Sequence, residues 1–125
     1  MDEAQTLADR YVAIWNETDP ERRRSAIATL WTTDGEHYVG VREARGYDAL
    51  EQRIIGSYEK NVRDNGYRFR AVKDARALHD VVTFHWEMLQ ADSQEVIATG
   101  LEFLLVDGQD RIRVDYQFVL SNRSS

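Results

Sequence analysis

Residues 79–119 read HDVVTFHWEMLQADSQEVIATGLEFLLVDGQDRIRVDYQFV and contain three apolar runs separated by short polar segments. In residues 81–89 and 111–119, large apolar side chains alternate with polar ones, which is the period of a strand with one buried face. The run between them, residues 96–106, is mostly apolar. Residues 107–110 predict a tight hairpin turn, because Gly108 can take the positive φ that such turns need. The segment therefore predicts an antiparallel meander of three strands.

Three amphipathic patterns upstream of this meander predict three helices. Residues 3–18 place a wide aromatic and aliphatic stripe at spacings of three and four. Asp19-Pro20 is a strong helix start, because Asp caps the first backbone N–H groups and Pro fits the first helical position, so we expect a second helix over residues 20–31. Residues 49–65 repeat apolar side chains four apart and carry a Glu59–Arg63 pair on the outside, which predicts a third helix.

Two shorter segments complete the predicted fold. Residues 36–39 form a candidate strand followed by a polar loop over residues 40–46, and residues 67–73 alternate as a strand does. The resulting order is two helices, a strand, a helix and four strands. We therefore expect an α+β fold in which three N-terminal helices pack on a strongly curved antiparallel sheet. A chain of 125 residues suffices for one such domain, over residues 1–125.

Composition limits the classes of function. A net charge of -6 disfavours binding to the phosphates of nucleic acids, and the lack of cysteine excludes disulfides, thiolate metal sites and cysteine nucleophiles.

No apolar run is long enough for a membrane span, and the N-terminus has acids where a signal peptide has bases, so we expect a cytoplasmic protein. His79 and His85 are too far apart on a strand to bind one metal ion, and no glycine-rich phosphate loop is present. We therefore expect neither a metal nor another cofactor.

A single carboxylate, Glu102, interrupts the apolar residues 100–104, where a charge needs a partner, water or a function. If Gly108-Gln109 forms a two-residue turn, Glu102 lies opposite Asp115 and shares its face with Gln117 and Val119. Two adjacent carboxylates in a poorly solvated site cannot both ionise cheaply, so one would stay protonated and could act as an acid. Alternatively, Arg113 or an arginine on a helix neutralises Glu102, and the pair is solvated. The opposite face gathers an apolar surface suited to a subunit interface: Leu101, Phe103, Leu105, Ile112, Val114, Tyr116 and Phe118.

Four short motifs occur in order along the chain: RYVAIWN at residues 10–16, LW at 30–31 with DG at 34–35, GYDAL at 46–50, and DG at 107–108 before RI at 111–112. Together they resemble the NTF2-like superfamily, and within it the SnoaL-like and ketosteroid-isomerase-like branch. The resemblance implies a cone-shaped α+β barrel with a deep pocket between the concave face of the sheet and the helices. It also implies homodimers formed through the outer face of the sheet. That superfamily includes isomerases, dehydratases, cyclases and non-catalytic binding modules, so the fold alone does not choose an activity.

The resemblance also implies roles for particular residues. Tyr11 matches the phenol that ketosteroid isomerases place in their oxyanion hole, and Glu102 matches their protonated acid; together these groups can hold a developing enolate. The catalytic base of that family is an acid on the first short strand, where this chain has Val39. His37, two residues earlier on the same strand face, is the candidate replacement because its pKa is near neutral. Tyr11 and His37 also fit a structural role, as a core residue and a hydrogen-bonded strand residue.

Aromatic side chains, Trp31 included, would either form the walls of a pocket for an apolar ligand or fill a close-packed core. The candidate ligand-binding residues are Trp15, Val39, Tyr58, Phe84, Trp86 and Gln117. One hypothesis is a cofactor-independent acid/base enzyme of the isomerase, cyclase or dehydratase type, acting on an apolar carbonyl compound. In it, Glu102 with Asp115 and Tyr11 polarises the substrate, and His37 moves the proton. The alternative is a non-catalytic module that binds a ligand or mediates dimerisation.

Overall fold

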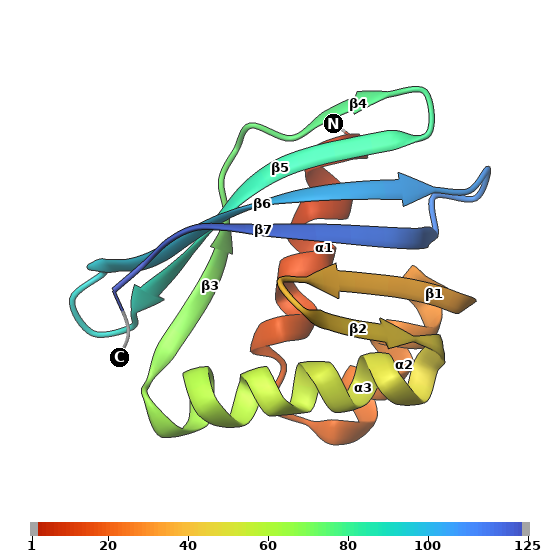
Figure 1. Ribbon diagram of the computed structural model, residues 1–125. Coiled ribbons are helices and arrows are strands. Elements are labelled where there is room, and N and C mark those ends of the chain that lie inside the picture. Colours follow the sequence, from red (N-terminus) through yellow and green to blue (C-terminus); the bar gives the residue numbers. More distant parts are fainter. Residues whose placement is uncertain (1–2, 124–125) are drawn as a thin grey trace.

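The computed structural model describes residues 3–123. The helices are α1 (Glu3–Asn16), α2 (Pro20–Leu30), α3 (Gly46–Ser57) and a π-helix, η1 (Tyr58–Asp64). The strands are β1 (Trp31–Val39), β2 (Arg42–Arg45), β3 (Tyr67–Ala71), β4 (Arg76–Leu78), β5 (Val81–Gln90), β6 (Val96–Val106) and β7 (Ile112–Asn122). They form one seven-stranded sheet that bends past α1, while α3 lies beneath β1 and β2 (Figure 1). The predicted α+β cone of helices on a curved sheet is confirmed; the sheet does not close into a barrel.

The sheet is mixed, whereas the sequence predicted an antiparallel one. Its strand order is β2-β1-β7-β6-β5-β3, and β4 pairs with β5 at one edge. β1 runs parallel to β7, with His37 opposite Asp115 and Val39 opposite Gln117, and the other strand pairs are antiparallel. The alternation of side chains identifies a strand but carries no information about its partner, which is why the prediction was wrong for β1. The pairing brings His37 beside the last strand.

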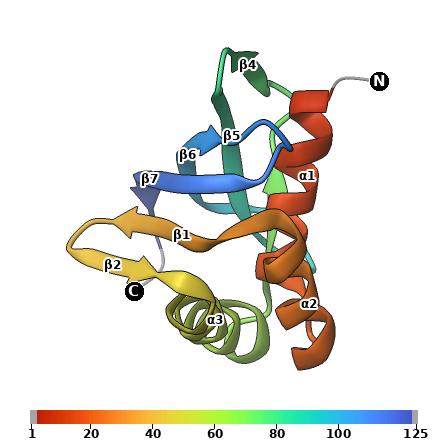
Figure 2. The same ribbon diagram turned by 90° about the vertical axis from the view of Figure 1, so that its right-hand side faces the viewer.

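The amphipathic pattern of the first helix is confirmed. α1 buries Leu7, Tyr11, Ile14 and Trp15 against the core. It ends at Asn16, whose side chain donates to the backbone oxygen of Phe69 (2.8 Å) and accepts from its backbone nitrogen (2.9 Å). The end of α1 is thereby fixed to β3. In the view of Figure 2, α1 and α2 stand on one side of the sheet, with α3 below it.

The second helix begins as predicted. The Asp19 side chain caps it by accepting from the backbone nitrogen of Glu21 at 3.0 Å, and Pro20 is its first residue. It ends at Leu30, one residue earlier than predicted. Trp31 instead begins β1 in extended conformation and is 1% exposed. The predicted strand over residues 36–39 is accordingly the second half of a longer strand.

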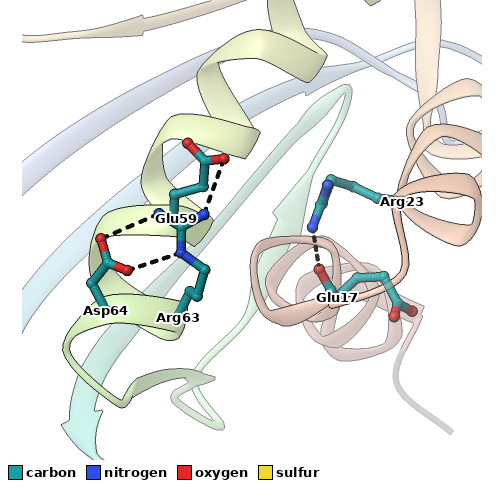
Figure 3. Close-up of polar contacts among 5 residues, drawn as sticks. All are labelled: Glu17, Arg23, Glu59, Arg63 and Asp64. Atoms are coloured by element: carbon teal, nitrogen blue, oxygen red, sulfur yellow. Dashed lines mark hydrogen bonds and ion pairs between the residues drawn. The ribbon is translucent and has the colours of Figure 1, made fainter.

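Polar contacts join the helices near the end of α1 (Figure 3). The buried guanidinium of Arg23 donates to the backbone oxygen of Glu17 at 2.8 Å and lies 4.7 Å from the centre of the Tyr58 ring. This links α2 both to the end of α1 and to the π-helix. On the π-helix itself the predicted Glu59–Arg63 ion pair forms at 3.4 Å, on the outside of the molecule (Figure 3).

The third helical segment differs from the single helix predicted over residues 49–65. α3 already begins at Gly46, and the predicted loop over residues 40–46 contains the short strand β2. From residue 58 to residue 64 the backbone is π-helical. Gly66, with φ of 69°, then reverses the chain toward β3. Single π-helical turns are wider than α-helical ones and occur frequently at functional sites.

The β6–β7 hairpin has a five-residue loop, where a two-residue turn was predicted. The backbone nitrogen of Asp107 donates to the backbone oxygen of Arg111 at 2.9 Å. The Asp107 side chain accepts from the backbone nitrogens of Gln109 (2.8 Å) and Arg111 (2.9 Å), and Asp110 takes a positive φ of 60°. The aspartate side chain thus organises the longer loop, a role that the glycine-based prediction did not consider.

The longer loop moves the register of the hairpin by two residues. Glu102 lies opposite Gln117 instead of Asp115, and Asp115 lies opposite Leu104. Because side chains alternate with a period of two, a shift of two keeps Glu102, Asp115 and Gln117 on one face, as predicted. A bulge between Leu105 and Val106 breaks this alternation, so Ile112 is fully buried instead of lying on the outer apolar surface.

No helix within residues 3–123 is both long enough and apolar enough to cross a membrane.

Candidate active site

Five polar side chains from four elements meet inside the cone. Tyr11 comes from α1, His37 from β1, Glu102 from β6, and Asp115 and Gln117 from β7. The side chains of Glu102 and Asp115 are 0% exposed, and Tyr11 and His37 are at most 3% exposed. Burial of so many ionisable groups is costly unless each finds a partner, so their contacts decide which of them carry charge.

The phenol of Tyr11 lies between the two carboxyl groups. Its Oη is 2.5 Å from Oδ2 of Asp115 and 3.2 Å from Oε2 of Glu102. A phenol has a single proton, and the much shorter contact indicates that Tyr11 donates it to Asp115. Burial, and then the charge of Asp115, raise the pKa of Tyr11 well above its usual value, so the phenol stays protonated. Asp115 therefore accepts the stronger of the two contacts of the phenol.

Glu102 is the carboxyl group whose pKa is shifted upward. Burial and then the nearby charge of Asp115 raise its pKa well above the usual value for a glutamate. The indole Nε1 of Trp86 donates to Oε1 of Glu102 at 2.9 Å, which opposes the shift but fixes the carboxyl group in place. The remaining oxygen, Oε2, lies 3.2 Å from the Tyr11 hydroxyl group. The raised pKa favours the protonated form of Glu102 in the folded chain.

His37 lies behind these groups. Its Nε2 is 3.1 Å from Oε1 of Gln117 and 3.4 Å from Oδ2 of Asp115, and both oxygens accept, so Nε2 carries the hydrogen. Burial lowers the pKa of His37, which keeps the imidazole neutral. Its Nδ1 is buried without a hydrogen-bond partner. The rings of Trp15 and Trp31 lie 5.6 Å and 6.4 Å from the imidazole and enclose it.

A cavity of about 580 Å³ opens above this cluster, within the range of small-molecule sites. Its wall includes six of the candidate residues: Tyr11, Trp15, Val39, Trp86, Glu102 and Gln117. His37 and Asp115 are not part of the wall and lie beneath it. Tyr58 and Phe84 are also absent from it: Tyr58 packs on Arg23, and Phe84 packs edge-on against Tyr11 at 5.6 Å. The wall is mixed in character, since polar side chains from α3 and η1 face the aromatic ones.

Sequence reasoning missed Arg53 of α3. Its guanidinium lies 5.1 Å from the centre of the Trp15 ring and lines the cavity, together with Arg42 and Lys60. A signal was present, because Arg53 lies three residues after Leu50 and one before Ile54, within the apolar stripe of the helix. An arginine in such a stripe faces the inside of the molecule.

Sequence reasoning also missed Gly100. A Cβ at this position would lie 2.1 Å from Cζ2 of Trp86. Only glycine therefore allows the indole to lie across β6 and reach Glu102.

Within residues 3–123, no group of three histidine, aspartate or glutamate side chains is arranged to hold a metal ion.

Three helices packed on a bent sheet, with a cavity between them, form the NTF2-like fold. Comparison with solved structures shows that the chain has this fold. A SnoaL-like family protein from Agrobacterium tumefaciens strain C58, described as a candidate isomerase, matches with a TM-score of 0.87 and 24% identity over 97% of this chain and all of that one. A SnoaL-like protein of unknown function from Burkholderia thailandensis matches with a TM-score of 0.71 and 14% identity, over 97% and 99% of the two chains. A candidate polyketide cyclase from Sinorhizobium meliloti matches with a TM-score of 0.66 and 9% identity, over 90% and 93%. At such identities the likeness establishes the fold and not an activity. No protein-family model and no curated protein sequence matches the chain.

Proposed function

We propose that the chain is a cofactor-independent acid/base enzyme acting on an apolar carbonyl compound, of the isomerase, cyclase or dehydratase type. One observation carries the proposal: the fully buried Glu102 lies on the wall of a cavity, where burial and the neighbouring Asp115 raise its pKa well above the usual value. A neutral carboxyl group in a poorly hydrated site can donate a strong hydrogen bond, or its proton, to a carbonyl or hydroxyl oxygen. This stabilises an enolate or a departing hydroxyl group, which the three reaction types have in common.

The surrounding residues support this acid. After Glu102 gives its proton to the ligand oxygen, Tyr11 can turn its single O–H from Asp115 toward the new carboxylate 3.2 Å away. Trp86 already donates to the other carboxylate oxygen. In an isomerisation, the Glu102 carboxylate then takes a proton from the carbon next to the carbonyl, which leaves a neutral dienol. Glu102 delivers this proton to the γ-carbon and takes back the proton on the ligand oxygen, so that the enone is released and Glu102 is again protonated. In this scheme His37 acts on Asp115, at 3.4 Å, and not on the ligand itself, so it is a positioning residue.

The test replaces the acid with its closest neutral analogue. Purified protein is assayed with a panel of apolar β,γ-unsaturated ketones and β-hydroxyketones, because isomerisation of the first and dehydration of the second both give a conjugated enone that absorbs ultraviolet light. We expect Glu102→Gln to lower turnover by about 100-fold or more while ligand affinity is retained. Glu95→Gln, which changes an exposed glutamate, is the matched control. Equal turnover by Glu102→Gln and the unaltered protein would refute the assignment.

The cavity wall lacks a catalytic base, and this favours a second function, ligand binding without catalysis. Val39 occupies the position of the family's catalytic base, and the two other candidate bases, His37 and Asp115, lie beneath the wall. A ligand that binds in the cavity and is recovered unchanged would support this alternative. In either case we propose a homodimer formed through the outer face of β6 and β7.

A further inference from the structure

Three cationic side chains line the cavity and have no anionic partner. Arg42 comes from β2, Arg53 from α3 and Lys60 from the π-helix η1. Among residues 3–123, none of the three forms an ion pair or a side-chain hydrogen bond. The single acid on the same wall is Glu102, whose pKa is raised well above its usual value. Cationic side chains therefore outnumber acids on the wall, although the whole chain has a net charge of -6 and Asp115 beneath the wall attracts Arg53.

Arg53 is the most constrained of these cations. Its Nε is buried without a hydrogen-bond partner, and its guanidinium stacks over the ring of Trp15 at 5.1 Å. Burial, and then repulsion by the neighbouring Arg42, disfavour its charge and lower its pKa. A guanidinium stays charged in spite of this, so the site holds an incompletely solvated cation beside a second one. Such an arrangement stabilises any anion that enters.

Elsewhere in the molecule, other arginines form ion pairs with carboxylates. Glu51 lies on α3 two residues before Arg53, yet it pairs with Arg24 of α2 at 3.0 Å. Arg70 likewise pairs with Glu87 at 2.6 Å. The carboxylate nearest to Arg53 on its own helix is therefore engaged elsewhere and does not neutralise the cavity arginine.

We propose that Arg53, supported by Arg42 and Lys60, forms an anion-binding subsite, and that the ligand is an apolar carboxylic acid. This inference rests on the proposed function, because it concerns a second group of the ligand whose oxygen meets Glu102. The planar guanidinium matches a carboxylate with two parallel hydrogen bonds, and its stacking on Trp15 holds the fork in a fixed orientation.

The rest of the wall favours a hydrocarbon body over a sugar or a nucleotide. Apolar side chains make up much of the remaining wall: Val12, Val39, Phe69, Met88 and Val119. Lys60 lies on a π-helical turn next to Asn61, which also lines the cavity, so the irregular helix turns both polar side chains toward the ligand. The structure thus favours a ligand with one carboxylate, an apolar middle and one carbonyl or hydroxyl oxygen.

The test uses two probes of the same shape, 2-naphthoate and 2-naphthamide, titrated into the protein by calorimetry at neutral pH. We expect naphthoate to bind about tenfold more tightly than the amide, and Arg53→Gln to remove this difference while leaving naphthamide binding unchanged. Arg24→Gln, which removes a paired surface arginine, should leave both affinities unchanged. Circular dichroism confirms that each variant is folded.

The outcomes separate this inference from the proposed function. If both probes bind with equal affinity, or if Arg53→Gln leaves naphthoate binding unchanged, the anion subsite is refuted and the cavity remains a ligand site. If neither probe binds, the cavity fails as a ligand site, and the proposed function is refuted with it.

Discussion

Glu102 connects the chemistry of the cavity with the stability of the fold. In the folded chain its pKa is raised, chiefly by burial. Below the usual glutamate pKa of about 4.3, both folded and unfolded chains hold the proton, so the group costs nothing. As the pH rises toward the folded pKa, the unfolded chain ionises freely while the folded chain must keep the proton or bury a charge. The contribution of Glu102 to stability is therefore present at low pH and lost as the pH rises.

We accordingly predict that the free energy of unfolding falls with rising pH, relative to that of Glu102→Gln, which cannot ionise. The loss should amount to about 1.4 kcal/mol for each unit by which folding raises the pKa. Urea unfolding followed by circular dichroism, from about pH 4 to about pH 9, measures it. Glu95→Gln should give a curve parallel to the unaltered protein. A pH-independent difference between the protein and Glu102→Gln would show that residue 102 is not a protonated buried acid.

At the scale of single residues, the sequence could identify acids out of place but not every cation. Glu102 was conspicuous because it interrupts an apolar strand, and Tyr11 because it lies on an aromatic stripe. Arg53 was overlooked in spite of its place in the apolar stripe of α3, because an arginine on a helix usually extends into solvent. The exact contacts of Asp115 and His37 depended on strand pairing, which periodicity cannot supply.

At the scale of elements, the pairing of β5 with β6 holds the acid in position. Trp86 lies directly opposite Gly100, and the indole crosses the space that a side chain on Gly100 would fill. From there its Nε1 reaches Glu102, two residues along β6. The glycine thus positions the acid through the tryptophan, without touching the cavity itself.

We predict that Gly100→Ala displaces the Trp86 indole and breaks its hydrogen bond to Glu102. Overpacking a strand pair in this way should cost about 1–3 kcal/mol of stability. The displacement should also change the near-ultraviolet circular dichroism of tryptophan and lower turnover. Gly56→Ala is the control for stability and spectra only, because Gly56 lines the cavity: outside its own helix turn no atom lies within 4 Å of its new Cβ, and alanine in place of helical glycine should stabilise by about 0.5–1 kcal/mol. Native-like spectra and stability for Gly100→Ala would contradict the positioning role.

The elements themselves were predicted to different degrees, for identifiable reasons. The helix start at Asp19-Pro20 and the three long strands follow from local chemistry, and the structure confirms them. The predicted two-residue turn after β6 was wrong because the side chain of Asp107, and not only Gly108, shapes the loop. The π-helix and the parallel β1–β7 pair were missed because both depend on contacts distant in sequence. The residues of the candidate site nevertheless lie on the predicted face of the sheet, because the predicted register of the β6–β7 hairpin was wrong by two residues, an even number.

At the scale of the whole molecule, β6 and β7 separate two different surfaces. Residues Glu102 and Asp115 face inward, while their neighbours Phe103 and Tyr116 face outward and pack edge-on at 6.2 Å. Tyr116 is 39% exposed, Phe118 53% and Leu120 57%. A contiguous apolar surface of this kind on a sheet is costly in water and suits a symmetric contact with a second copy.

We predict that Phe118→Lys disrupts a homodimer formed through this outer face, because the substitution places a like charge from each copy near the twofold axis. A buried aromatic at such a contact typically contributes enough that its loss raises the dissociation constant by about tenfold or more. Sedimentation velocity over a range of protein concentrations measures the change. Leu78→Lys, at a residue 79% exposed on β4, is the matched control and should leave the oligomeric state unchanged.

Since Phe118 adjoins Gln117, whose amide contacts His37, loss of the dimer should also alter ligand affinity. A protein that is monomeric at every concentration, or a Phe118→Lys variant that sediments like the unaltered protein, would refute the dimer.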